Sequence, residues 1–97
     1  MQSTDKLLKT LQDFKQKHAQ EYGLLEIGLF GSVARGELKE SSDVDVVIRI
    51  ERPDLFLLAG LKSELEEVLQ CPVDIVTYRE NMNPFLKRRI DKEALYA

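Results

Sequence analysis

Residues 43–50 alternate two acidic side chains with mostly β-branched ones, and this alternation constrains the fold more than any other feature of the sequence. Successive side chains of a β-strand point to opposite faces, so Asp43 and Asp45 share one face while Val44 and Val46 face the opposite layer. Two carboxylates about 5 Å apart repel each other by roughly 3 kcal/mol at an effective dielectric near 20. A divalent cation reverses this sign, because carboxylate oxygens are the ligands that Mg²⁺ prefers. The strand is therefore predicted to carry metal-assisted phosphate chemistry, although acids at a strand start could also cap a turn or remain solvated.

A small, flexible turn lies upstream of this strand. Residues 24–30 form a short apolar run that predicts a buried strand, and Gly31 and Ser32 follow directly at its carboxyl end. Residues 33–35 are expected to begin a short helix whose free amide groups would favour an anion beside Gly31. Arg35 is a candidate phosphate contact, although a solvated arginine would look the same in the sequence.

Length and composition predict one soluble domain, residues 1–97. The chain has 43% hydrophobic and 32% charged residues, as is ordinary for globular proteins. With a net charge of −3, the chain lacks the excess of basic residues that sequence-independent nucleic-acid binding needs. We find no apolar signal-peptide core and no apolar run long enough to span a bilayer, and the single cysteine, Cys71, fits a reducing compartment. We therefore expect a cytoplasmic protein without membrane contact and without direct nucleic-acid binding.

The remaining pattern predicts a small α/β sheet. Ser3 or Thr4 can cap a first amphipathic helix, Asp54 can cap a second one, and Asn83 with Pro84 opens a third. Helices are expected between residues 3 and 23, over 55–69 and over 84–91, with strands at 24–30, 43–50 and 73–77 and a short closing strand at 94–96. Strands separated by helix-length segments are typical of an α/β arrangement.

The third strand contains a single charge, Asp74, which is expected to be buried and therefore to need a partner. Tertiary pairing of the strands would place Asp74 beside Asp43 and Asp45. The same acid could instead pair with Lys62 or Arg79, since both situations look identical in the sequence. Three carboxylates on neighbouring strands would make a metal site.

Three other features lie outside this acidic motif, and for the first two a structural interpretation outweighs a functional one. His18 lies on the apolar stripe of the first helix, without a cysteine, histidine or acid at ligand spacing, so a packed histidine is predicted. Lys87, Arg88 and Arg89 suggest a solvated helix face, with RNA or an acidic partner surface as alternatives. Residues 55–58 form an apolar run broader than one stripe, and part of it is expected to face another subunit.

Taken together, these residues resemble the nucleotidyltransferase superfamily, and in length the minimal nucleotidyltransferases, or MNT proteins, which are typically encoded beside a HEPN partner. The superfamily pattern is a glycine and serine after the first strand, an acid-x-acid pair opening the second strand, and a later third acid. Gly31, Ser32, Asp43, Asp45 and Asp74 match this pattern in order. The resemblance covers almost the entire chain and implies an α+β fold, with a small mixed sheet and helices mainly on one face.

The resemblance also implies a reaction, namely transfer of AMP from ATP with the help of Mg²⁺, two ions being expected. The three acids would hold the metal ions and act in catalysis, and Asp74 could also receive the proton of the acceptor hydroxyl. Gly31, Ser32 and Arg35 would bind the phosphates of ATP.

The resemblance also implies a second protein. Many related enzymes carry an additional domain that binds the acceptor, and this sequence shows no such domain. A partner in a hetero- or homo-oligomer would complete the pocket or would itself be the acceptor. The leading hypothesis is an antitoxin that adenylylates and neutralises a HEPN ribonuclease toxin. The alternatives are a non-catalytic antitoxin that acts by binding its HEPN partner, and a nucleotidyltransferase for a small molecule such as an antibiotic.

Overall fold

Three helices and four strands follow one another along residues 3–37 and 43–97, the part of the chain that the computed structural model describes. They are α1 (Thr4–Tyr22), β1 (Leu24–Phe30), β2 (Val44–Ile50), α2 (Leu55–Leu69), β3 (Val73–Thr77), α3 (Pro84–Glu93) and β4 (Leu95–Tyr96). The three long helices and all the strands agree with the sequence prediction, although β2 begins one residue later and α3 continues to Glu93. No helix in these two ranges is long and apolar enough to cross a membrane.

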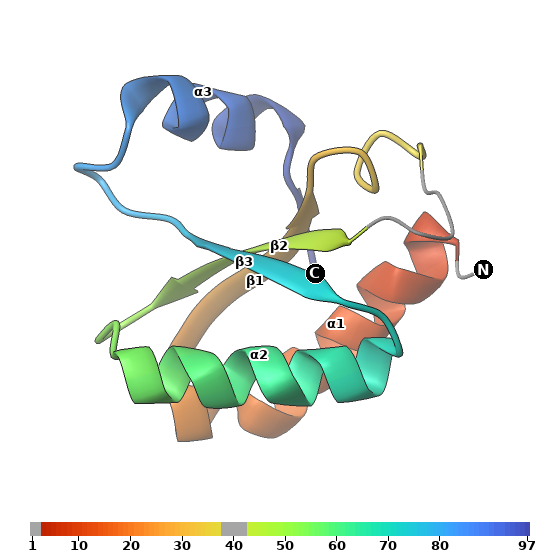
Figure 1. Cartoon of the computed structure of the whole chain (residues 1–97), viewed down its shortest axis with the longest axis vertical. Helices are drawn as coiled ribbons and strands as arrows, with labels where there is room; N and C mark the ends of the chain where they lie inside the picture. Colours follow the sequence, from red (N-terminus) through yellow and green to blue (C-terminus); the bar gives the residue numbers. More distant parts are fainter. Residues whose placement is uncertain (1–2, 38–42) are drawn as a thin grey trace.

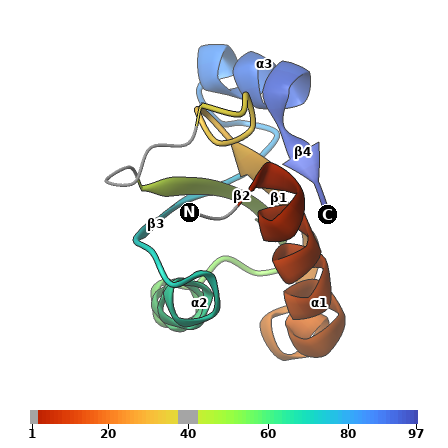
Figure 2. The same ribbon diagram turned by 90° about the vertical axis from the view of Figure 1, so that its right-hand side faces the viewer.

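The strands form one mixed sheet in the order β3-β2-β1-β4. Figure 1 labels β1, β2 and β3, and Figure 2 also labels β4. β2 and β3 are parallel, because α2 carries the chain back to the end of the sheet at which β2 began. β1 pairs in antiparallel fashion with both β2 and β4. The prediction of an α+β fold with a small mixed sheet is therefore confirmed.

The helices cover the two faces of the sheet unequally (Figure 2). α1 and α2 lie on one face and enclose the main core, which includes Val44 and Val46 of β2. α3 lies on the other face over a smaller cluster of Phe30, Val47 and Ile90. Since alternate residues of β2 enter different cores, the predicted alternation is confirmed, and the odd-numbered positions of β2 face the side of α3.

Local signals determine where α1 begins and ends. The Ser3 side chain accepts a hydrogen bond from the backbone N–H of Lys6 at 3.2 Å, and Gly23 ends the helix in the left-handed conformation at φ +64°. Between these ends, Leu7 and Leu11 are fully buried at helical spacing. α1 is thereby packed along the sheet with its amino end near the turn that follows β1.

α2 buries Leu61 and Leu65, but its first turn is open to solvent. Leu55 and Phe56 are 85% and 91% exposed, as expected for an apolar run that extends beyond the core. Val68 is a further exception among the apolar residues of this helix. Its side chain is 45% exposed, because it lines a pocket between α1 and α2 instead of packing on the sheet.

The close approach of β4 to β1 depends on Gly28. A Cβ atom at this position would lie 2.6 Å from the carbonyl oxygen of Leu95 and 3.0 Å from the Cα of Tyr96, and both are backbone atoms that cannot move independently. We therefore expect Gly28→Ala to lower the free energy of unfolding by about 1 to 3 kcal/mol through overpacking. Chemical denaturation monitored by circular dichroism measures this change.

Gly60→Ala is the matched control for this prediction. Its new Cβ would meet only the Tyr22 hydroxyl, at 3.9 Å, and alanine favours a helix over glycine by roughly 0.5 to 1 kcal/mol. The control is expected to be neutral or stabilising. Equal stability of both variants would contradict the role assigned to Gly28.

Candidate functional site

Parallel pairing of β2 with β3 places two acidic residues in register. Asp45 and Asp74 are Cα partners in this ladder, so their side chains leave the same face of the sheet side by side. Asp43 lies two positions earlier, directly before β2 begins. The predicted approach of Asp74 to Asp45 is therefore present in the fold, and Asp43 lies at the same end of β2.

The three acids differ in their exposure to solvent. Asp43 and Asp74 are exposed, whereas Asp45 is half-buried. The expectation that Asp74 is buried is wrong, because β3 is an edge strand of the sheet and this residue projects from the uncovered part of the α3 face. Among the described residues Asp74 forms no ion pair with Lys62 or Arg79, so that alternative for its role does not apply.

The carboxylate of Asp45 rests directly on Gly31. Gly31 is buried with φ +73°, and a Cβ atom at this position would collide with Asp45 Oδ2. Only glycine allows both this backbone conformation and this contact. The small turn and the acidic strand, which were found separately in the sequence, therefore form one continuous surface.

Residues 33–35 do not begin a helix, and the predicted support from a helix amino terminus is wrong. The backbone forms tight turns in which Ala34 N–H donates to Gly31 O at 3.2 Å and Gly36 N–H donates to Val33 O at 3.2 Å. Gly36 ends this segment at φ +75°. Val33 is buried and its carbonyl accepts a 3.0 Å hydrogen bond from Thr4, which fastens the turn to α1.

Two arginines lie on the rim of this surface. Arg35 is exposed, and its guanidinium contacts Glu37 at 3.0 Å and Glu93 at 3.7 Å. Arg89 of α3 lies 3.7 Å from the same Glu93, and its Cζ is 5.5 Å from the centre of the Phe30 ring. The role of Arg35 as a phosphate contact stays a prediction, and the structure places Arg89, which the sequence pattern assigned to a solvated face, near Asp45 as well.

The three consecutive basic side chains of α3 therefore have different neighbours. Lys87 contacts Glu80 at 2.9 Å, Arg88 lies over the ring of Phe85 and is exposed, and Arg89 faces the acidic site. A signal for Arg89 was present in the sequence, because a glutamate follows it by four residues and the buried Ile90 marks the inner side of the helix. Charge alone did not separate it from its neighbours.

The protonation of Asp45 reflects this environment. Burial raises the pKa of its carboxyl group above the usual range, and the neighbouring Asp74 and Asp43 raise it further, while Arg35 and Arg89 act in the opposite direction. Burial and like charges thus make the ionised form costly. Three carboxylates beside a glycine that leaves their oxygens accessible are a donor set that fits Mg²⁺, which takes a few protein carboxylates and completes its shell with substrate phosphates and water.

A second group of possible metal ligands lies on the other face of the sheet, on α1 and α2. His18 Nδ1 is 2.8 Å from Glu21 and His18 Nε2 is 3.5 Å from Glu64, with one ligand atom of each residue within 4.8 Å of the others. The statement that His18 has no acid at ligand spacing is therefore wrong, since Glu21 follows it by about one helical turn. Tyr22 also donates a hydrogen bond to Glu64, so these groups satisfy one another and link the two helices.

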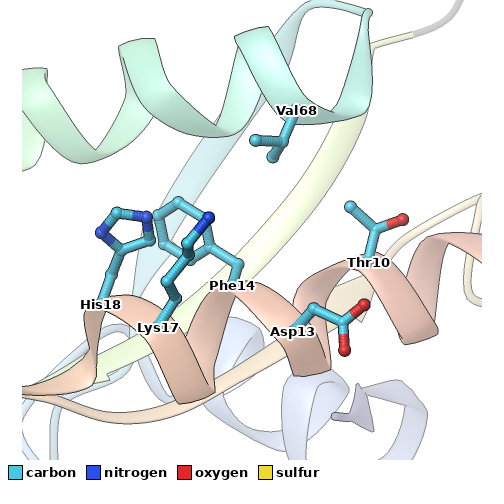
Figure 3. Close-up of a pocket in the computed structure, with 6 residues that line it drawn as sticks. All are labelled: Thr10, Asp13, Phe14, Lys17, His18 and Val68. Atoms are coloured by element: carbon cyan, nitrogen blue, oxygen red, sulfur yellow. The ribbon is translucent and has the colours of Figure 1, made fainter.

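A pocket of about 180 Å³ adjoins His18 between the two helices (Figure 3). It is lined by Thr10, Asp13, Phe14, Lys17, His18 and Val68. Pockets that hold small molecules usually measure roughly 300 to 1,000 Å³. Because this pocket is smaller and lies on the face opposite Asp45, we exclude it from the candidate site.

Comparison with known proteins decides the family. The model of the nucleotidyltransferase domain family matches residues 7–97. The chain belongs to this family. It is therefore an enzyme of the transferase class, as its motifs predicted.

Relatives of this nucleotidyltransferase are similar to it along almost their whole length. A protein of Methanocaldococcus jannaschii, named as a candidate protein adenylyltransferase, is 35% identical over 97 residues, which cover 92% of this chain and 99% of the relative. The protein adenylyltransferase MntA of Thermococcus cleftensis is 32% identical over 97 residues, which cover 99% and 97% of the two chains.

Solved structures share the fold. A candidate minimal nucleotidyltransferase superposes with a TM-score of 0.79 at 32% identity, over 97% of this chain and 95% of the other. A chain of the tri-AMPylated Shewanella oneidensis HEPN toxin in complex with its MNT antitoxin gives a TM-score of 0.65 at 19% identity, over 93% and 70%. The second likeness concerns the fold alone, and the first confirms the resemblance to minimal nucleotidyltransferases.

The raised pKa of Asp45 leads to a prediction about how the stability of the folded protein depends on pH. An acid that binds its proton more tightly in the folded state makes folding less favourable as the pH rises above its unfolded pKa, near 3.9. We expect Asp45→Asn to be more stable than the wild type at pH 7 by about 0.5 kcal/mol after solvent screening. The advantage should vanish below about pH 3.5, and denaturant titrations in EDTA at both pH values measure it.

Asp13→Asn is the control for this measurement, because Asp13 is exposed on α1 and pairs with Lys9 at 3.4 Å. This substitution should give no gain in stability at pH 7. Added Mg²⁺ should stabilise the wild type and the control but not Asp45→Asn, since a ligand that binds only the folded state shifts its stability by mass action. A lower stability of Asp45→Asn in EDTA at pH 7 would refute the electrostatic account.

Proposed function

We propose that this nucleotidyltransferase transfers AMP from ATP to a hydroxyl group of a HEPN-type partner protein in the cytoplasm, in a Mg²⁺-dependent reaction that makes it an antitoxin. One observation carries the proposal. Asp45 stands in register with Asp74 on the next strand and at the same time rests on Gly31, so the acids that would bind metal adjoin the turn that would hold the phosphates. Neither feature alone would distinguish a site from a solvated acid.

Each group has a defined part in this proposal. Asp43, Asp45 and Asp74 would hold two Mg²⁺ ions. The bound ions would neutralise the charge of the triphosphate. The backbone at Gly31 would lie close to the β- and γ-phosphates, because no side chain blocks the approach. Ser32 is partly exposed and would donate its hydroxyl proton to a phosphate oxygen.

The reaction is a displacement at the α-phosphorus of ATP. The acceptor hydroxyl oxygen forms a bond to this phosphorus, while the bond to the oxygen that bridges to the β-phosphorus breaks. Pyrophosphate leaves with the electron pair of the broken bond, and the hydroxyl proton passes to a base. Asp74 is the proposed base, since it is exposed on the edge strand where an acceptor arriving from outside the chain would meet it.

The exposure of the site favours a protein acceptor. Asp43 and Asp74 are exposed, so a hydroxyl group on the surface of another protein could approach them. The relatives named as protein adenylyltransferases support this choice. The solved complex of an AMPylated HEPN toxin with its MNT antitoxin supports the HEPN partner and the adenylyl group.

A second candidate function is neutralisation by binding alone. It is favoured by Leu55 and Phe56, which are almost fully exposed at the start of α2 and offer an apolar surface to a partner. This surface lies on a helix of the opposite face of the sheet from the acids. Binding could therefore persist when the acids are neutralised.

The two functions differ in the effect of Asp43→Asn. Incubation of the wild type with labelled ATP, Mg²⁺ and a HEPN-type partner is expected to label the partner, and the variant should label it about 100-fold more slowly or not at all. Asp13→Asn should act like the wild type. In cells, Asp43→Asn should fail to suppress the toxicity of the partner.

Other outcomes would select the alternatives. Full protection by Asp43→Asn, with no labelled partner in any reaction, would establish a binding antitoxin and contradict the proposal. Adenylylation of a small molecule in the absence of any partner protein would contradict the proposed acceptor. Labelling that persists after removal of divalent cations with EDTA would contradict the Mg²⁺ requirement.

A further inference from the structure

Two arginines beside the acids are joined through one carboxylate, that of Glu93. Arg35 Nη1 lies 3.7 Å from Glu93 Oε1, and Arg89 Nε lies 3.7 Å from Glu93 Oε2. Arg35 belongs to the turn after β1, whereas Arg89 and Glu93 lie on α3. Glu93 therefore brings together cationic groups from two segments that are far apart in the sequence.

Arg89 lies directly beside the site. Its Cζ is 5.5 Å from the centre of the Phe30 ring, and Phe30 is the Cα partner of Asp45 on the neighbouring strand. Residues in register direct their side chains to the same face of the sheet. The guanidinium group thus covers the residue that both adjoins Asp45 and immediately precedes Gly31.

The contacts with Glu93 leave most of the guanidinium donors uncommitted. A guanidinium carries five N–H donors, and the separations of 3.7 Å exceed the roughly 2.7 to 2.9 Å of a charge-assisted hydrogen bond. Glu93 Oε2 is buried and accepts no hydrogen bond from the residues that the structure describes. Glu93 therefore lies between the two arginines without saturating them, and Glu37 takes up only one further donor, the Nε–H of Arg35, at 3.0 Å.

A polyphosphate is the anion that fits this arrangement. Guanidinium groups recognise phosphate oxygens through paired N–H donors, and two of them stand beside the turn that contains Gly31. The acids of β2 and β3 repel an anion unless cations separate them from it. Cationic side chains on the Gly31 side would divide the surface into a half suited to metal ions and a half suited to phosphates.

We propose that Arg89 is a phosphate-binding residue of this site and that Glu93 is a positioning residue that holds Arg89 and Arg35 toward the triphosphate. The inference rests on the proposed function, since it adds a residue to the site of the same substrate. The arginine run on α3 then has one member with a functional role and one, Arg88, without it.

The test compares Arg89→Gln with Arg88→Gln in calorimetric titrations of ATP and of AMP in the presence of Mg²⁺. Arg89→Gln should weaken ATP binding by about 10-fold, since hydrogen bonds to charged groups are lost, and should weaken AMP binding less, because AMP lacks the β- and γ-phosphates. Arg88→Gln should change the affinity for ATP by less than about 2-fold, because the Arg88 side chain lies over the ring of Phe85. The affinity of Arg89→Lys for ATP should lie between those of the wild type and Arg89→Gln.

Glu93→Gln tests the positioning role. It removes the charge that lies between the two arginines, while Glu37 still pairs with Arg35 at 3.0 Å. The substitution should raise the KM for ATP about 3-fold while leaving kcat unchanged. A purely structural ion pair would instead change the thermal midpoint and leave the KM unaffected.

The possible failures are distinguishable. Equal affinities of the wild type and Arg89→Gln for ATP would overturn this inference and leave the proposed function intact. Equal losses of affinity for ATP and AMP would also overturn it, since phosphate recognition requires a difference between them. Failure of the wild type to bind ATP would contradict the proposed function and this inference together.

Discussion

The parallel pairing of β2 with β3 is the constraint on which the rest of the structure depends. It sets Asp45 against Asp74, a like-charge pair that is unfavourable by itself, and the fold accepts this cost because the alternate residues of both strands fill the main core. α2 supplies the crossover that makes parallel pairing possible. A shift of one residue in this register would place the acids in the core, so the hydrophobic pattern that stabilises the sheet also fixes the acids on the opposite face.

Two groups of titratable side chains among the described residues differ in an informative way. His18, Glu21 and Glu64 lie close together, but each has an oppositely charged or hydrogen-bonding partner within the group, and they join α1 to α2. Asp45 has Asp74 and Asp43 as neighbours, and Arg35 and Arg89 offset burial and these like charges only in part, so the pKa of Asp45 stays raised. An incompletely compensated cluster lowers stability until a cation or substrate arrives, which is expected of a functional site rather than of a structural link.

The sequence predicted the strands and the long helices because alternation and helical spacing act locally. The approach of Asp74 to Asp45 is tertiary, and it was expected only because strands separated by a helix-length segment can pair in one sheet. The sequence did not predict the exposure of Asp74, since that depends on the position of β3 at the sheet edge. It also missed Arg89, because the approach of α3 to Phe30 is a tertiary arrangement that no local pattern encodes. Residues 33–35 form a turn and not the predicted helix, because Gly36 ends the backbone hydrogen bonds after a single turn.

The central claim is that Asp43, Asp45 and Asp74 bind metal ions next to a triphosphate held by the turn at Gly31. Its most direct test is a crystal structure with Mn²⁺ and a non-hydrolysable ATP analogue, in which anomalous scattering locates the metal. The account predicts Mn²⁺ between the carboxylates of Asp45 and Asp74, with the phosphates of the analogue over Gly31. Anomalous signal only at His18, or an analogue bound in the pocket between α1 and α2, would contradict it.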